Sequence, residues 1–207
     1  MLNFENKALK LTFNALKRTD EAIHKFVLLE SLSDPLDCKP GCHFCCFNLP
    51  MVTPLEALAI GHHLDKNFTD QQKRTLNSKI QKILNKIIDK RSDEIFMMRH
   101  ELPCIFLEQS MCLIYGVRPV ICRTCSSTDA THCEMIFNQK NHRARLRTYP
   151  QMYEILQDIH SQLKAYCREN GCQSDTLHLP EAVDDYLKHP DAIGAWSRGQ
   201  IIFHTLI

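Results

Sequence analysis

The residues of this sequence most able to do chemistry are cysteines gathered in two short segments. They are Cys38, Cys42, Cys45, Cys46, Cys104, Cys112, Cys122 and Cys125. Four of them fall within residues 38–46, around a Pro40-Gly41 turn, and the other four fall within residues 104–125. Thiolates that converge on a small volume bind zinc and iron–sulfur clusters, and short spacings bring them together at a low cost in loop-closure entropy. The sequence therefore predicts a metal centre held by these eight thiols.

The spacing of the thiols favours an iron–sulfur cluster over zinc. Both accept four thiolates, but zinc sites usually pair two Cys-x-x-Cys knuckles. Only Cys42 to Cys45 and Cys122 to Cys125 have that spacing. The adjacent pair Cys45-Cys46 does not suit a single mononuclear knuckle. We therefore expect an iron–sulfur cluster, with zinc as the alternative, and the pattern leaves open whether the thiols form one site or two.

Three further cysteines lie outside these segments. Cys167 falls on the apolar stripe of an expected helix, where a free thiol behaves as a small buried hydrophobe. Cys133 and Cys172 lie in polar segments, and a supporting ligand role is not favoured for either of them. None of the three is included in the predicted ligand set.

Amphipathic helices are expected on both sides of the cysteines. Apolar residues at helical spacing predict one helix from Leu9 to a point before Ser33, and another over residues 152–167. Thr53-Pro54-Leu55-Glu56 has the pattern of a capping box and predicts a short helix through about Leu64. The same pattern in Thr69 to Gln72 predicts a longer helix that runs to about Met98. In the remainder of the chain, regular structure is expected to be broken at Gly171, Pro180, Pro190 and Gly194.

A small hairpin is expected inside the second cysteine segment. Residues 104–107 and 112–115 are predominantly apolar, and the more polar residues 108–111 separate them. The predicted fold is mainly α with a small β-hairpin, and an irregular cysteine-rich metal-binding core lies between the helices. We expect a single domain over residues 1–207. Its parts are a core at 38–125, an N-terminal helix within 1–37 and a helical extension at 126–207.

The overall composition limits the class of protein. The chain has 207 residues, of which 44% are hydrophobic, and this is enough to bury a core without disulfides. The formal net charge of +1 creates no field that would draw the chain to nucleic acid or to an anionic membrane, so neither is an expected partner. No stretch has the pattern of a secretory signal or of a membrane span. We therefore expect a cytoplasmic protein, in which eleven cysteines are better explained by metal ligation than by disulfides.

The cysteine segments and their neighbours resemble the YkgJ-type cysteine cluster family, which comprises zinc- or iron-chelating domains with a CxxCxxCC signature. The matching residues are Cys42, Cys45, Cys46, Glu56, Cys104, Cys112, Tyr115, Arg118, Pro119, Cys122 and Arg123. The spacing from Cys38 to Cys42 is one residue longer than in the signature, and Cys125 is an addition to it. The resemblance implies metal or cluster binding. It also implies a possible activity, because the family includes flagellin lysine N-methylases, which are linked to an iron–sulfur cluster and S-adenosylmethionine.

Three residues near the thiols have a structural and a functional interpretation. Glu56 is explained by the capping box, with a role beside the metal ligands as the alternative. Arg118 and Arg123 are expected either to donate hydrogen bonds to thiolates or sulfides, or to form surface ion pairs. The sequence contains no acid–base set that identifies a reaction, so an enzyme is neither predicted nor excluded.

Three functions remain open at this point. The first is a protein with a cysteine-ligated centre that acts as a redox or metal sensor, a carrier or an adaptor, together with a protein partner or substrate that the sequence does not identify. The second is an S-adenosylmethionine-dependent protein lysine N-methylase. The third is a structural or regulatory zinc-binding protein.

Overall fold

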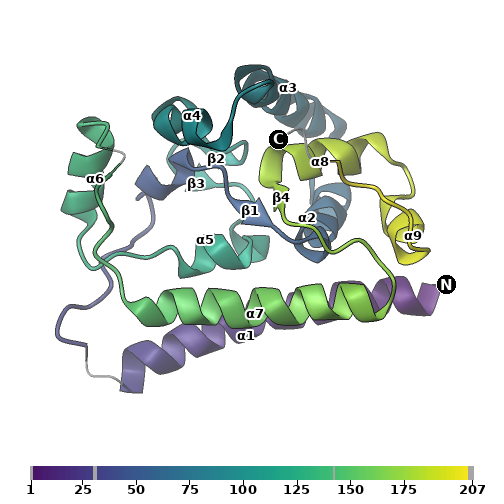
Figure 1. Cartoon of the computed structure of the whole chain (residues 1–207), viewed down its shortest axis with the longest axis horizontal. Coiled ribbons are helices and arrows are strands. Elements are labelled where there is room, and N and C mark those ends of the chain that lie inside the picture. Colours follow the sequence, from purple (N-terminus) through teal and green to yellow (C-terminus); the bar gives the residue numbers. More distant parts are fainter. Residues whose placement is uncertain (1, 30–31, 142, 205–207) are drawn as a thin grey trace.

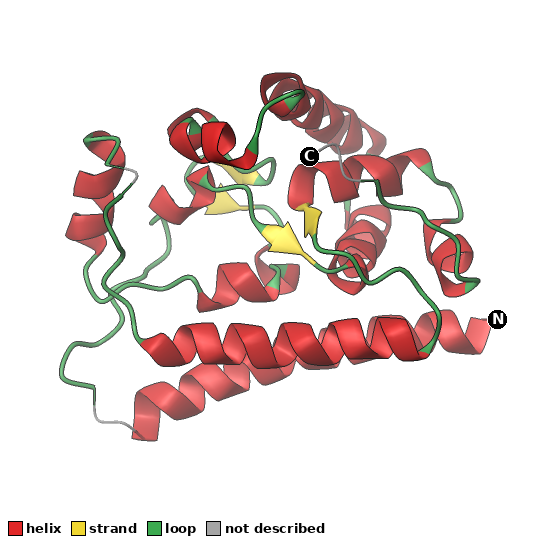
Figure 2. Cartoon of the chain, viewed as in Figure 1, coloured by secondary structure: helices red, strands yellow, loops and turns green. Residues whose placement is uncertain are grey.

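Helices make up most of the molecule, and two small antiparallel ribbons complete it (Figure 2). The computed structural model describes residues 2–29, 32–141 and 143–204. The elements are α1 (Leu2–Leu29), the 3₁₀ helix η1 (Phe44–Phe47), β1 (Met51–Val52), α2 (Pro54–Asn67), α3 (Asp70–Ile87), α4 (Ser92–Met97), η2 (Arg99–Glu101), β2 (Leu107–Glu108), β3 (Met111–Cys112), η3 (Tyr115–Val117), α5 (Val120–Thr124), α6 (Ala130–Asn138), α7 (Pro150–Glu169), β4 (Leu177–His178), α8 (Leu179–Lys188) and α9 (Ala192–Ser197). This architecture confirms the predicted fold class.

The long helices α1 and α7 lie side by side along one edge of the molecule (Figure 1). Both also pack against α5, the short helix that carries Cys122. α1 begins at Leu2, earlier than the predicted Leu9. Tertiary packing explains the extra turns, because the Phe4 ring stacks on Tyr166 and Trp196 at centroid distances of 6.0 and 6.4 Å. The pair of helices forms a rigid support beneath the cysteine segments.

The C-terminal region forms the other end of the core. α8 packs on α2 and α3, and the fully buried Trp196 of α9 donates a hydrogen bond from Nε1 to the carbonyl oxygen of Gln173. The prediction that Pro180 breaks regular structure is wrong. Pro180 lies in the first turn of α8, where a missing N–H costs nothing because those groups have no partner within the helix. No helix in the described part of the chain is both long and apolar enough to cross a membrane.

The two predicted capping boxes are confirmed, but the helix that begins after Thr69 is shorter than predicted. It ends at Ile87 instead of reaching Met98. Asp89 adopts a left-handed conformation with φ of 59°, which aspartate tolerates better than most residues, and the chain turns before α4. The turn lets Ile87 and Ile95 both reach the core, where they are buried. Packing therefore overrides a helical pattern that looked continuous in the sequence.

The predicted hairpin exists and is tighter than expected. Leu107 of β2 pairs with Cys112 of β3, and Gln109 and Ser110 form the turn with φ of 47° and 63°. Positive φ at both central residues matches the right-handed twist of the flanking strands. The β1–β4 ribbon was not predicted, because its two strands are far apart in the sequence. It pairs Met51 with His178.

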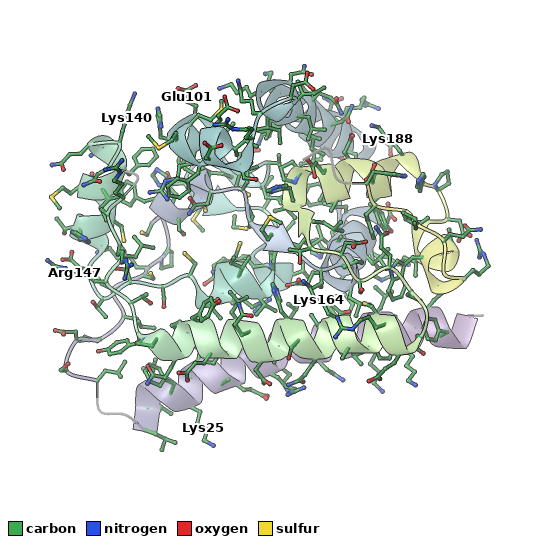
Figure 3. All side chains as sticks on the ribbon, in the orientation of Figure 1. Lys25, Glu101, Lys140, Arg147, Lys164 and Lys188 are labelled. Atoms are coloured by element: carbon green, nitrogen blue, oxygen red, sulfur yellow. The ribbon has the colours of Figure 1, made fainter. Side chains whose placement is uncertain are left out.

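Charged side chains cover the outside of these elements. Lys25, Glu101, Lys140 and Lys188 are exposed and lie at the periphery of the molecule (Figure 3). The hydrophobic core runs continuously from α1 to α9 and includes Leu58, Ile80 and Phe106, each at most 1% exposed. The cysteine segments therefore rest against one continuous core.

Gly61 of α2 provides a test of this packing. A Cβ at this position would overlap the buried ring of Tyr186, whose hydroxyl donates to Asp65 Oδ2 at 2.7 Å and so holds the ring in place. We expect Gly61→Ala to lower the free energy of unfolding by about 1–3 kcal/mol, as overpacking does. Urea denaturation followed by circular dichroism measures this change.

Gly116→Ala is the matched control for this substitution, because a Cβ there meets no atom within 4 Å. Its expected effect is within about 0.5 kcal/mol of wild type. Equal stability of the two variants would contradict the tight contact between α2 and α8.

Candidate metal centre

The first cysteine segment forms a tight turn followed by a 3₁₀ helix. Gly41 has φ of 90°, a left-handed conformation that glycine adopts without strain, and the N–H of Cys42 donates to the carbonyl oxygen of Lys39 at 3.0 Å. Cys45 and Cys46 then lie in η1. The expected Pro40-Gly41 turn therefore exists, and it places the thiols of this segment close to one another.

A backbone hydrogen bond joins the two cysteine segments. The N–H of Cys104 donates to the carbonyl oxygen of Cys46 at 2.7 Å. The N–H of Leu113 donates to the carbonyl oxygen of Phe106 at 3.0 Å, and this bond and the strand pairing fold the hairpin over so that Cys112 comes close to Cys104. The hairpin therefore brings two thiols of the second segment toward η1.

The end of the second segment returns to the beginning of the first. Cys122 lies in α5 and Cys125 caps its C-terminus. Two residues further on, the carbonyl oxygen of Ser127 accepts from the N–H of Asp37 at 2.9 Å, and the N–H of Ser127 donates to the Cys38 thiol at 3.3 Å. The two segments are thus joined at both ends.

The Cys45 thiol lies where the two segments meet. It hydrogen-bonds with the thiols of Cys46 and Cys125, each of which is half-buried. It also interacts electrostatically with the thiols of Cys38, Cys42, Cys104, Cys112 and Cys122. The structure therefore places the other seven thiols of the predicted ligand set near the Cys45 side chain, while the role of all eight as ligands remains a prediction.

The protonation of the thiols follows from this arrangement. Hydrogen bonds from Cys125 and Cys46 lower the pKa of Cys45 to about 3. Its hydrogen bond and negative charge, together with burial, raise the pKa of Cys46 and Cys125. Burial raises the pKa of Cys104 to about 12. A metal would replace the shared protons, because thiols bind metals as thiolates.

The donor set fits a thiophilic metal chemically. Among the described residues, no three His, Cys, Asp or Glu side chains are placed to hold a single metal ion as they stand. The thiols are instead paired by hydrogen bonds around Cys45. Metal binding would release protons from the thiols and draw their sulfur atoms together around the metal.

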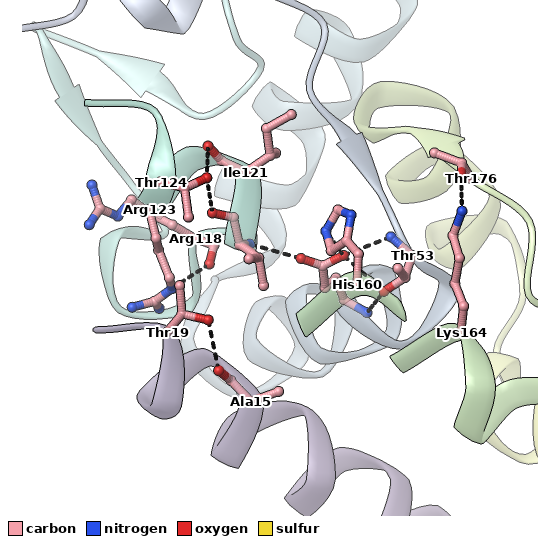
Figure 4. Close-up of polar contacts among 12 residues, drawn as sticks. Ala15, Thr19, Thr53, Arg118, Ile121, Arg123, Thr124, His160, Lys164 and Thr176 are labelled. Atoms are coloured by element: carbon pink, nitrogen blue, oxygen red, sulfur yellow. Dashed lines mark hydrogen bonds and ion pairs between the residues drawn. The ribbon is translucent and has the colours of Figure 1, made fainter. Parts of the chain in front are cut away.

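The two arginines of the second segment have different roles. Arg118 lies over the Tyr115 ring, with Cζ 3.9 Å from the ring centroid, and its charge lowers the pKa of Cys45. Arg123 is buried and forms an ion pair with Asp20 of α1. It also donates to the carbonyl oxygens of Gly116 and Arg118, the latter at 2.8 Å (Figure 4). Arg118 therefore places a positive charge near the thiols, and Arg123 holds α5 in place.

Glu56 completes the predicted capping box and also accepts a hydrogen bond from the helix that carries Cys122. Its side chain is 1% exposed, and Oε2 accepts from the N–H of Thr53 at 2.7 Å, which completes the capping box. Oε1 accepts from the N–H of Val120 at 2.8 Å, at the start of the helix that carries Cys122. His160 Nε2 of α7 lies 3.2 Å from Oε2 (Figure 4). One carboxylate therefore ties α2, α5 and α7 together beneath the thiols.

The ionisation of Glu56 predicts a dependence of stability on pH. Burial raises the pKa of this carboxyl, but His160 and the N–H groups of Thr53 and Val120 outweigh burial and hold it below its ordinary value of 4.5. A carboxyl with a lowered pKa contributes stability above its unfolded pKa, and this stability is lost as the pH falls through the folded pKa. We expect unfolding experiments between about pH 6 and 3 to show a steeper loss of stability for wild type than for Glu56→Gln. Parallel curves would contradict this assignment.

The structure also gives the three remaining cysteines their positions. Cys167 is 0% exposed and belongs to the hydrophobic core, as expected, and Cys172 is buried beside it. Cys133 of α6 is half-buried and interacts electrostatically with Cys38 and Cys42. Cys133 was not predicted as a ligand because it lies in a polar segment, and its position after the Asp129 helix cap is the one sequence feature that indicates a fixed orientation.

A small cavity opens beside the thiols. It has a volume of about 90 Å³, and both Cys45 and Cys133 line it. Phe44 and Phe137 form an aromatic wall, and Lys140 adds a positive charge. The cavity gives access to the centre from the side of α6.

The fold and the site define a class of protein, a helical protein with a thiol-rich metal centre between its helices. The family model of the CxxCxxCC domain, described as a putative zinc- or iron-chelating domain, matches residues 37–167. The chain belongs to this family and is therefore a metal-binding protein. The comparisons with curated proteins and with solved structures found no match.

Proposed function

We propose that this protein binds an iron–sulfur cluster through the Cys45 group, defined as Cys45, Cys46, Cys104, Cys112, Cys122 and Cys125. The observation that carries the proposal is that Cys45 hydrogen-bonds with Cys46 and Cys125 and interacts electrostatically with the other thiols of this group, which come from both cysteine segments. A zinc ion takes four ligands at one point, whereas a cluster takes thiolates spread over a larger volume. Six thiols from a 3₁₀ helix, a hairpin and the end of α5 suit the larger centre.

Arg118 supports this proposal. Its buried Nε has no hydrogen-bond partner among the described residues, and its guanidinium interacts with the thiols of Cys45, Cys112 and Cys122. The sulfides and thiolates of a cluster would provide acceptors for such a donor. Hydrogen bonds and positive charge near the sulfur atoms raise the reduction potential of a cluster.

The function that we propose for the cluster is redox or sensory, in a cytoplasmic protein that acts on a protein partner. A lysine N-methylase is the second candidate. The cavity beside Cys45 has about 90 Å³, well below the roughly 300–1,000 Å³ of pockets that enclose drug-sized ligands such as nucleoside cofactors. For this reason we favour the redox or sensory role of the cluster over methyl transfer.

Anaerobic purification, followed by analysis of iron, zinc and acid-labile sulfide, tests the proposal. We expect iron and sulfide together, with a brown chromophore that dithionite bleaches. Zinc without sulfide would overturn the cluster and support the structural or regulatory zinc protein. A change of the spectrum on adding S-adenosylmethionine would favour the methylase.

A further inference from the structure

The cavity beside the thiols lies between three short elements. η1 packs against both α6 and η2 (Figure 1). The Phe137 ring, near the end of α6, lies 4.6 Å from the Phe47 ring and 5.8 Å from the Phe44 ring, measured between centroids. At the start of α6, the N–H of Ala130 donates to the carboxylate of Asp37 at 3.0 Å. Both ends of α6 are therefore held against the first cysteine segment, and the shape of the cavity is fixed by these contacts.

The walls of the cavity are mostly apolar. The three phenylalanine rings line it together with Ile136, Ala144 and Leu146. Its volume is about 90 Å³. An apolar cavity of about 150 Å³ holds benzene, which has six carbons, so by volume this cavity fits an apolar group of roughly four carbons. The Cys45 thiol that lines it is exposed, so a group that enters the cavity reaches the thiols.

Two cations at this cavity lack an anionic partner. Within the described part of the chain, neither the Arg99 nor the Lys140 side chain forms an ion pair or a hydrogen bond, and the Arg99 guanidinium contacts the Phe96 ring, with Cζ 4.7 Å from the centroid. Arg99 is half-buried, and desolvation lowers its pKa. None of the described residues that line the cavity is Asp or Glu. His100, which also lines it, lies with Nε2 3.4 Å from Glu101 Oε1. Arg99 and Lys140 are therefore available to an anion from solution.

Lys140 occupies a position where glycine is usual. Its N–H donates to the carbonyl oxygen of Phe137 at 3.1 Å, and the N–H of Asn141 donates to that of Ile136 at 3.0 Å. These are the two bonds of a Schellman motif, which places the residue after the helix cap in a left-handed conformation. Lys140 accordingly has φ of 50°, which glycine would adopt without strain, and its side chain lies at the end of α6 (Figure 3). Helix termination alone therefore does not account for a lysine at this position.

We propose that this cavity binds a short-chain organic carboxylate, with its apolar chain against the phenylalanine rings and its carboxylate against Arg99 and Lys140. A guanidinium binds a carboxylate through two parallel charge-assisted hydrogen bonds, which makes Arg99 the main partner of the anion. Because Cys45 lines the same cavity, the ligand would lie next to the metal centre. A link between this ligand and a sensory role rests on the proposed function, whereas carboxylate binding does not depend on which metal is bound.

Titration with isovalerate tests the inference, because its apolar body of four carbons matches the volume of the cavity. Full-length wild type is purified anaerobically with the metal that it contains, and ligand-observed NMR measures the dissociation constants of isovalerate, acetate and isoamyl alcohol. We expect isovalerate to bind at least about 10-fold more tightly than acetate, which lacks the apolar body. We also expect at least about 10-fold tighter binding than that of isoamyl alcohol, which lacks the charge.

Single substitutions locate the site. We expect Arg99→Gln to weaken isovalerate binding by about 10-fold. Ala144→Leu, which fills part of the cavity, should weaken it as well. Lys140→Gly should weaken binding by about 2- to 5-fold, as loss of an exposed ion pair does, and should unfold at the temperature of wild type or above, because glycine removes the strain. Lys82→Gln is the matched control, because it removes an exposed charge that does not line the cavity and should bind as wild type does.

Three results would overturn the inference. They are the absence of saturable isovalerate binding, equal affinities for isovalerate and isoamyl alcohol, and an unchanged affinity in both Arg99→Gln and Lys140→Gly. If Arg99→Gln does not fold, Lys140→Gly decides the question. Metal and sulfide analysis of the same preparations separates this inference from the proposed function. Zinc without sulfide would refute the cluster and leave the carboxylate site standing, whereas iron and sulfide without isovalerate binding would do the reverse.

Discussion

The Cys45→Ser variant is expected to lose the iron–sulfur centre. Cys45 interacts with the thiols of both cysteine segments, and the hydrogen bonds from Cys125 and Cys46 lower the pKa of its thiol. Serine removes the soft ligand and the negative charge at the point where the segments meet. Loss of a partner outside the ligand shell already costs roughly 10- to 100-fold in metal affinity, and we expect loss of Cys45 to cost more. Iron and sulfide analysis of the variant after anaerobic reconstitution measures this.

Cys172→Ser provides the control for the Cys45 substitution. Cys172 is buried beside Cys167, and its thiol donates to the carbonyl oxygen of Asn170, away from the centre. The control should therefore retain iron and sulfide. A Cys45→Ser variant with a full complement of iron and sulfide would show that the cluster, if present, uses other thiols.

Glu56→Ala is expected to lower the free energy of unfolding by about 3–5 kcal/mol, the cost of breaking a buried charged contact. The substitution leaves the N–H groups of Thr53 and Val120 without their acceptor and removes the partner of His160. These groups are buried, so water does not replace the carboxylate readily. Because Val120 begins the helix that carries Cys122, we also expect metal to be released faster to a chelator.

Gln72→Ala is a matched control, because Gln72 completes an exposed capping box with Thr69. It should cost about 1 kcal/mol or less and leave the rate of metal release unchanged. Urea denaturation and chelator kinetics on the three proteins test both expectations. If Glu56→Ala lowered the free energy of unfolding no more than Gln72→Ala and released metal no faster, Glu56 would act only as a helix cap.

The sequence identified the helices whose signals are local. The capping boxes at Thr53 and Thr69 were predicted correctly, because a cap needs only residues that are three positions apart. The hairpin around Gln109 and Ser110 was predicted for the same reason, from two apolar segments around a short polar turn. The family was also within reach of the sequence, because the order and spacing of the cysteines define it.

The tertiary structure decided what depends on residues far apart in the chain. The break after Ile87 arises because both α3 and α4 have apolar faces to bury, and the β1–β4 ribbon joins residues 51–52 to residues 177–178. The two roles of Glu56 require Val120, which the local pattern of α2 does not contain.

For the metal centre, the sequence alone predicted which residues bind metal, because thiols in short segments are recognisable by type and spacing. It did not determine that Cys45 lies between the segments, or that Cys133 lies near Cys38. Those positions follow from hydrogen bonds and helix packing that join distant segments, such as Cys104 to Cys46 and Asp37 to Ala130. The chemistry of each residue is encoded locally, whereas the partners that it meets are fixed only when the core has formed.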